Sequence, residues 1–147
     1  MVRLNPWYIV GFVEGEGCFA ITISKHKTKK LGLDARLVFE IELREDDRPL
    51  LGEIRNLFKV GHIYRLDYRR PGWSPHTKYS VHSLREIKSV IIPFFKKYPL
   101  KGRKKKSFEI FCQAVTLFEK KEHLTEKGIK KLRKLRISMN QKKKRDH

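Results

Sequence analysis

The chain has 147 residues, of which 39% are hydrophobic, so it is long enough to bury a core of its own. Lysine and arginine number 35 against 16 acidic residues, and a formal charge of +19 favours a polyanionic partner such as nucleic acid. No apolar run reaches the roughly 18 residues that span a bilayer, and no signal peptide is visible. We therefore expect an intracellular protein, in a prokaryotic cytoplasm or an organelle, with no membrane partner.

The first half of the sequence predicts a helix, two strands and a second helix. Asn5 and Pro6 are typical of a helix start, and the first helix is expected from Pro6 to Glu14. Two segments then alternate between apolar and polar residues and predict a hairpin with one wet face: Phe19 to Lys27 and Arg36 to Arg44. A second helix is expected to start at Asp46 and to end at Gly61.

The second half roughly repeats this plan and then adds helices. A second hairpin is expected from His62 to Arg70 and from His76 to His82. Ser83 with Glu86 predicts the capping box of a helix that Pro93 and Pro99 bracket at its end. A further helix is expected from Ser107 to about Lys121, and Thr125 is expected to cap a last helix. The sequence therefore predicts one α+β domain over residues 1–147, with a mobile basic tail over residues 140–147.

The cysteines give no sign of a zinc site. Cys18 and Cys112 are the two cysteines of the chain, and neither belongs to a CxxC pair. We interpret both as reduced thiols.

The most informative segment is Ile9 to Gly17, with the sequence Ile-Val-Gly-Phe-Val-Glu-Gly-Glu-Gly. It closely resembles the nine-residue motif of the LAGLIDADG homing endonucleases. Gly11 and Gly15 are one helical turn apart, so two such helices can pack backbone to backbone. Two Glu16 carboxylates would then lie close together and need a cation between them, for which Mg²⁺ is suited. The simpler alternative is a glycine-rich turn with solvent-exposed acids.

Two weaker segments extend the resemblance from residue 5 to about residue 118. Phe39 to Gly61 looks like the second strand and helix of the family, and Tyr98 to Lys104 with Phe108 looks like its basic junction. The resemblance implies an α+β fold of the order αββαββα with extra C-terminal helices and a saddle-shaped antiparallel sheet.

The resemblance also implies roles for individual residues. Glu16 takes the place of the metal-binding acid, which is usually aspartate, and Gly15 would offer its backbone carbonyl. A basic residue near the scissile phosphate would be Lys104, or else Lys101, although a merely solvated lysine run remains open. Glu14 is expected to cap or pack. Leu43 falls where the family often has a polar residue, so Glu42, Arg44 or Arg48 must substitute, or the role is absent.

The family places its sheet in the major groove of DNA, where each base pair shows a distinct edge. The expected DNA-binding residues are those on the faces turned away from the core and in the loop after the first strand: Thr22, Ser24, His26, Lys27, Lys29, Arg36, Val38, Glu40, Glu42, Arg44, His62, Tyr64, Tyr68, Arg70, His76, Lys78 and Ser80. The basic residues near Arg103 and from Lys142 to Arg145 would contact phosphates or remain solvated.

Because each chain has one motif, each chain is expected to recognise one half of the DNA target. We therefore expect a homodimer, with an interface made by Val10, Gly11, Glu14 and Gly15, and a pseudo-palindromic duplex target. The resemblance implies an intron-encoded enzyme that leaves short 3′ overhangs with Mg²⁺; Mn²⁺ is expected to substitute, and Ca²⁺ to support binding without cleavage.

Two other functions remain open at this point. The first is an RNA-splicing maturase on the same fold, which would make RNA a partner. The second is a non-catalytic basic binding protein, which would bind any sequence with a steep dependence on salt.

Overall fold

The computed structural model describes residues 3–67 and 71–140. The first half contains α1 (Pro6–Glu16), β1 (Gly17–Lys25), β2 (Leu33–Arg44), a 3₁₀ helix (Glu45–Asp47) and α2 (Arg48–Phe58). The second half contains β3 (His62–Leu66), β4 (His76–Val81), α3 (Leu84–Glu86), a π-helical turn (Ile87–Ile91), α4 (Ile92–Lys97), α5 (Arg103–Glu119), a 3₁₀ helix (Glu122–Leu124) and α6 (Glu126–Asn140). Within the described residues, no helix combines the length and apolarity needed to cross a membrane.

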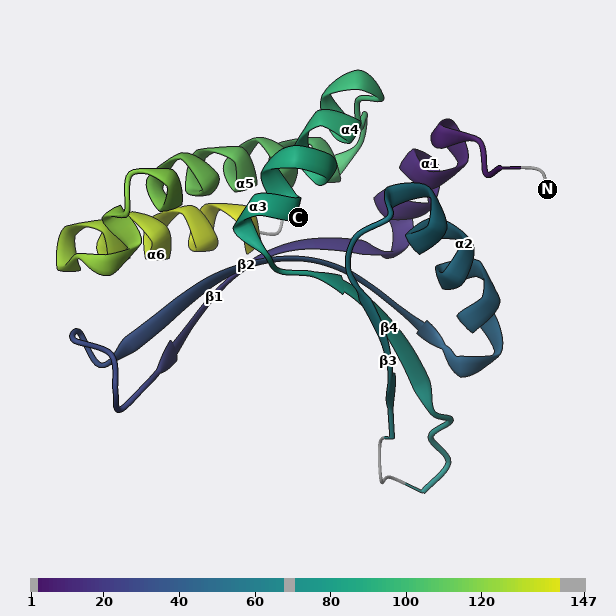
Figure 1. The fold of residues 1–147 in the computed structure, drawn as a ribbon, viewed down its shortest axis with the longest axis horizontal. Helices are drawn as coiled ribbons and strands as arrows, with labels where there is room; N and C mark the ends of the chain where they lie inside the picture. Colours follow the sequence, from purple (N-terminus) through teal and green to yellow (C-terminus); the bar gives the residue numbers. More distant parts are fainter. Residues whose placement is uncertain (1–2, 68–70, 141–147) are drawn as a thin grey trace, which may run out of the picture.

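The four strands form one antiparallel sheet in the order β1-β2-β4-β3. The long strand β2 pairs with β1 from Gly17 opposite Ile41 to Lys25 opposite Leu33, and with β4 over its second half. The sheet curves into an arch, with the helices on its convex side, and none of the helices in the described part of the chain covers the concave side (Figure 1). The expected α+β fold with a saddle-shaped sheet is confirmed.

Aromatic rings fill the space between the sheet and the helices. The Phe19 ring lies 5.2–5.5 Å from the rings of four other phenylalanines: Phe39, Phe95, Phe108 and Phe111. On β2 the alternate residues are buried, from Leu37 to Leu43, because the pleat turns every second side chain toward the helices. The alternation in the sequence therefore predicted the buried face of the sheet correctly.

Three predicted helix caps are confirmed. The Asn5 side chain accepts a hydrogen bond of 2.9 Å from the backbone N–H of Trp7. The Ser83 hydroxyl accepts from the N–H of Glu86, and the Thr125 hydroxyl accepts from the N–H of Gly128. Each cap satisfies a backbone donor that the first helical turn leaves without a partner.

The helix after Ser83 ends at Lys97, between Pro93 and Pro99 as predicted. It continues through Pro93 because the turn over Ile87–Ile91 widens to π geometry just before the proline, which cannot donate to the preceding turn. Several other predicted boundaries were wrong. The helix predicted from Ser107 begins at Arg103. The second helix ends at Phe58, since Lys59 already has a left-handed backbone with φ of 63°. Strand β3 ends at Leu66 rather than extending to residue 70.

Candidate nucleic-acid interface and metal site

The concave face of the sheet carries most of the residues predicted to contact DNA. Paired residues on neighbouring strands share a face, and the register places Thr22 opposite Arg36 and Glu42 opposite Lys78, with Tyr64 on the far side of Lys78. The same face holds Ser24, Val38, Glu40, Arg44, His62, His76 and Ser80. His26, Lys27 and Lys29 lie in the exposed loop after β1. Tyr68, Arg70 and the tail from Lys142 to Arg145 lie outside the described residues.

One of these residues is poorly placed for DNA contact. Ser80 faces the concave side between Glu40 and His62, but only 4% of it is exposed. Its short side chain lies below the longer side chains of the neighbouring strands. The prediction that Ser80 contacts DNA does not fit this burial.

Ion pairs link several of the concave-face residues. Arg36 donates from Nε to Asp34, over 2.7 Å, and this hydrogen bond lowers the pKa of the Asp34 carboxyl. The Nζ of Lys78 lies 3.5 Å from Glu40 and 3.7 Å from Glu42. The concave face is therefore a surface of fixed donors and acceptors rather than a uniformly basic one.

Glu16 is the last residue of α1 and is exposed at the point where the helix meets β1. The chain can enter the strand there because residue 17 is glycine: a Cβ at Gly17 would lie 2.6 Å from the Val13 side chain. Within residues 3–67 and 71–140, the Glu16 carboxylate forms no ion pair or hydrogen bond with another side chain. The backbone N–H of Gly17 donates to Val13, and the carbonyls nearer the helix end, including that of Gly15, have no helical donor.

These groups suit half of a metal site. A carboxylate and a backbone carbonyl are the oxygen ligands that Mg²⁺ and Ca²⁺ prefer. Among the described residues of one chain, no three His, Cys, Asp or Glu side chains cluster closely enough to hold a metal ion. A complete site at Glu16 therefore needs ligands from outside the chain, such as a second Glu16 and the phosphates of a substrate.

Lys104 lies near this end of the sheet. It is half-buried in the first turn of α5, and its charge acts on the thiol of Cys18, two residues after Glu16. Burial and the charge of Glu40 raise the pKa of Cys18, while Lys104 and Lys78 partly oppose them. The side chain of Lys101 is exposed just before α5.

Glu14 has the capping and packing role expected for it, with partners that the sequence did not reveal. One of its carboxylate oxygens accepts hydrogen bonds from the backbone N–H groups of Lys101 and, over 2.7 Å, of Gly102. The bonds from Gly102 and then Lys101 lower the pKa of Glu14. Glu14 therefore binds the start of α5. Its predicted place in a dimer interface required it to lie on the open side of α1, and this contact turns it away from that side.

The open side of α1 includes two of the four residues predicted for a dimer interface, Gly11 and Gly15, and two others. Val10 was predicted to lie there, but it is 5% exposed and packs in the core. Tyr8, Gly11, Phe12 and Gly15 share one helix face by their spacing, and the rings of Tyr8 and Phe12 stack 6.2 Å apart. A Cβ added at Gly11 or Gly15 would meet nothing within 4 Å. The spacing of three, four and seven residues was the signal that could have found Tyr8 and Phe12.

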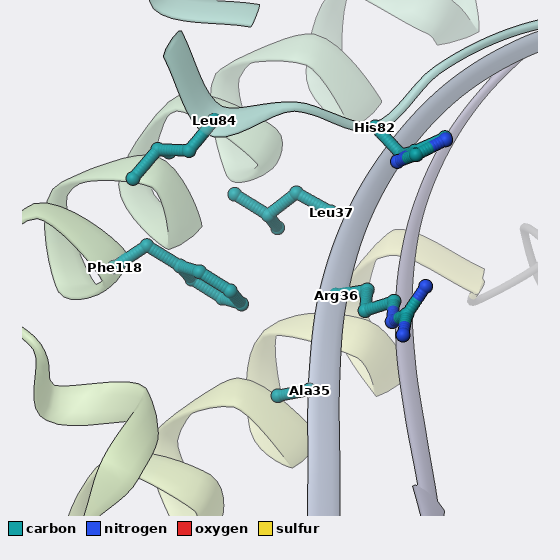
Figure 2. A pocket seen from close by; sticks show the side chains of 6 residues that line it. All are labelled: Ala35, Arg36, Leu37, His82, Leu84 and Phe118. Carbon is teal, nitrogen blue, oxygen red and sulfur yellow. The ribbon is translucent and has the colours of Figure 1, made fainter.

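A small cavity of about 170 Å³ lies elsewhere, between β2 and the end of α5. Its lining residues are Ala35, Arg36, Leu37, His82, Leu84 and Phe118. Leu37 and Phe118 point into it, whereas the polar side chains of Arg36 and His82 point away (Figure 2). The hollow is partly open to solvent, and two of the side chains that point into it, Leu37 and Phe118, are apolar.

Solved structures with the same architecture are homing endonucleases. The homing endonuclease I-TnaI superimposes with a TM-score of 0.83 at 30% identity, covering 95% of this chain and 90% of that one. I-SmaMI bound to an uncleaved DNA target in the presence of calcium ions gives a TM-score of 0.84 at 32% identity, covering 94% of this chain and 45% of that one. The fold is thus the LAGLIDADG homing-endonuclease fold.

Sequence comparison agrees with the fold. The model of the LAGLIDADG endonuclease family matches residues 9–115, and the chain belongs to this family. It is 36% identical over 138 residues to the Probable intron-encoded endonuclease 2 of Neurospora crassa, which covers 93% of this chain. The matched region spans 29% of that relative's length.

Proposed function

We propose that this chain is a site-specific DNA endonuclease that acts as a homodimer and hydrolyses both strands of a long pseudo-palindromic target with a divalent metal ion. The observation that carries the proposal is the position of Glu16. It is an exposed carboxylate, without a side-chain partner among the described residues, at the end of a helix with an open glycine face, beside a polar sheet face that none of the described helices covers. A purely DNA-binding protein has no need of this acid at that place.

The open face of α1 supports the dimer. Gly11 and Gly15 leave room for a second backbone, while Tyr8 and Phe12 offer apolar area around them. Two α1 helices packed on this face by a two-fold axis would bring the two Glu16 carboxylates together. Each concave face would then bind one half of the target, which accounts for the pseudo-palindrome.

The metal is proposed from the chemistry of the groups present. Glu16 and the carbonyl of Gly15 would hold Mg²⁺, with Mn²⁺ as a substitute and Ca²⁺ supporting binding without cleavage. A bound ion of this kind supplies Lewis-acid stabilisation and a more acidic water. Lys104, with Lys101 as the alternative, would bind the scissile phosphate and stabilise its charge. Short 3′ overhangs are the expected product.

The test is cleavage of a randomised duplex library by the purified protein, with Mg²⁺ or with EDTA, followed by sequencing of the cut ends. We expect cuts at one pseudo-palindromic site only with the metal. Glu16→Gln should abolish cutting and leave binding of that site intact, because it removes the charge that holds the metal but no predicted DNA contact. Glu53→Gln, which changes an exposed acid on α2, is the matched control and should cut normally. Equal cutting by Glu16→Gln would refute the site assignment.

A further inference from the structure

Two oppositely charged side chains stand together in the middle of the concave face, on the two central strands. Lys78 of β4 lies directly across from Glu42 of β2, yet its Nζ is closer to Glu40, at 3.5 Å against 3.7 Å. The residue across from Glu40 is Ser80, which is too short to separate the two. Lys78 therefore bridges the two carboxylates and reaches along the sheet to Glu40 as well as across to Glu42.

The two carboxylates beside Lys78 differ in what else they bind. One oxygen of Glu42 lies 3.0 Å from Nδ1 of His76 and the other faces Lys78. For Glu40, the described residues provide a single ion-pair partner, Lys78, through Oε2. The Oε1 atom of Glu40 is therefore left to accept a hydrogen bond from a ligand on the concave face.

Lys78 remains a donor in this position. Burial alone would lower its pKa, but the negative charges around it, that of Glu40 first, outweigh burial and raise the pKa. A protonated ammonium group only donates hydrogen bonds, and an ionised carboxylate only accepts them. The pair thus presents one donor group and one acceptor group side by side.

We propose that Lys78 and Glu40 together read one G·C base pair of the target, with Lys78 donating to guanine and Glu40 accepting from the N4 amino group of cytosine. The inference rests on the proposed function, since it needs duplex DNA on the concave face. Lys78 and Glu40, which the sequence alone predicts as two separate DNA contacts, would thus share a single base pair.

The donor and the acceptor of the pair are neighbours, as they are on the edge of a G·C base pair. Cytosine N4 donates to guanine O6, so these two atoms lie about 2.9 Å apart. Nζ of Lys78 lies 3.5 Å from Oε2 of Glu40, which is bonded to the same carbon as the accepting Oε1. Guanine N7, next to O6, gives the ammonium group a second acceptor. An A·T pair offers its donor between two separate acceptors, adenine N7 and thymine O4, the second of which lies beside the thymine methyl group, so it gives the ammonium group no adjacent pair of acceptors. G·C is therefore preferred, with guanine toward β4 and cytosine toward β2.

The experiment selects bound duplexes from a randomised library in EDTA and sequences them for each variant. The wild type should enrich guanine at one position of each half-site. Lys78→Met and Glu40→Gln should each weaken that preference about tenfold or more, at the same position, and change no other position. Lys130→Met, on the exposed side of α6 behind the sheet, is the control and should change none.

A charge-exchanged double variant provides a second test, which is needed if the single substitutions disturb folding. Glu40→Lys combined with Lys78→Glu retains the opposite charges and should exchange guanine for cytosine at that position, while thermal unfolding reports whether each variant folds. Changes at two different positions, at none, or a uniform loss of affinity would overturn the shared readout. If the wild type enriches no sequence at all, the proposed function fails, and this inference with it.

Discussion

The backbone N–H of Gly102 donates a hydrogen bond of 2.7 Å to the carboxylate of Glu14, although the two residues are 88 positions apart in the sequence. Gly102 is the residue before α5, and Lys104 lies in the first turn of that helix. The first acid of the motif helix thus holds the segment that carries the candidate phosphate-binding lysines. This bond joins the two parts of the proposed active site within one chain.

Replacing Glu14 by alanine should lower the free energy of unfolding by roughly 1 kcal/mol, less than is usual for bonds to a charged group, because the carboxylate is only partly buried and solvent screens it. The pKa of Glu14 is lowered in the folded state by the bonds from Gly102 and Lys101. Its contribution is therefore fully present above the ordinary glutamate pKa of about 4.3 and is lost as the pH falls through the lower folded pKa.

Urea unfolding between neutral pH and pH about 3 measures this effect. The stability difference between wild type and Glu14→Ala should shrink toward the acid end. Glu53→Ala, on the exposed surface of α2, should show little difference at any pH. A Glu14→Ala deficit that stays constant over the whole range would rule out the charged hydrogen bond as its cause.

Gly11→Ala and Gly15→Ala should separate folding from association. Nothing lies within 4 Å of the added Cβ in the single chain, and alanine favours a helix over glycine by about 0.5–1 kcal/mol, so the dissociated chain should not lose stability. In a dimer packed on this face, each Cβ would push the helices apart and weaken association by about tenfold or more.

Sedimentation over a range of concentrations measures the association of these variants. Gly52→Ala is a matched control, because it also adds a Cβ in open space within a helix, on α2. It should leave association unchanged. Unaltered association of Gly11→Ala and Gly15→Ala would place the dimer contact elsewhere.

Local patterns sufficed to predict the parts of the fold that depend on neighbouring residues. The alternation in β2 identified its buried face, and the glycines and acids around Glu16 identified the motif helix. The helix caps at Asn5, Ser83 and Thr125 follow from bonds over two or three residues. Each of these features is set by periodicity or by a contact short in sequence.

The features that the sequence did not predict depend on distant contacts. The bond from Gly102 to Glu14 cannot be seen without the fold, and the burial of Val10 depends on which side of α1 meets the core. The alternation of side chains along β4 places Ser80 on the concave face, but it is only 4% exposed between its longer neighbours on β2 and β3. Alternation assigns a side chain to one face of the sheet, and only the packing around it decides whether it is exposed on that face.

We expect His123 to make the stability of the fold depend on pH. Its ring stacks on Phe118 with a centroid distance of 4.1 Å, and its Nδ1 atom is buried without a hydrogen-bond partner among the described residues. Burial, helped by the charge of Lys29 and opposed by Asp34, lowers its pKa. A base with a lowered folded pKa destabilises the fold as the pH falls below its ordinary value of about 6.5.

His123→Phe should keep the stacking and remove this part of the acid destabilisation. Thermal unfolding at pH about 7.5 and about 5.5 compares the variant with wild type. The loss of melting temperature between the two pH values should be smaller in the variant. His82→Gln, which changes an exposed histidine, should retain the wild-type loss. The same loss in His123→Phe and in wild type would exclude His123 as the source.

Lys27 and Lys78 should differ in how they affect the salt dependence of DNA binding. Lys27 lies exposed in the loop after β1, where it can reach a phosphate, while Lys78 is half-buried in the sheet and paired with Glu40. Each phosphate contact contributes about 0.9 to the slope of log affinity against log salt, so Lys27→Gln should reduce the slope by about 2 in a homodimer. Lys78→Gln should leave the slope nearly unchanged and alter base preference instead.

Titrations of the selected target at several salt concentrations measure both slopes. An unchanged slope for Lys27→Gln would mean that this lysine is only solvated, and a reduced slope for Lys78→Gln would make it a phosphate contact.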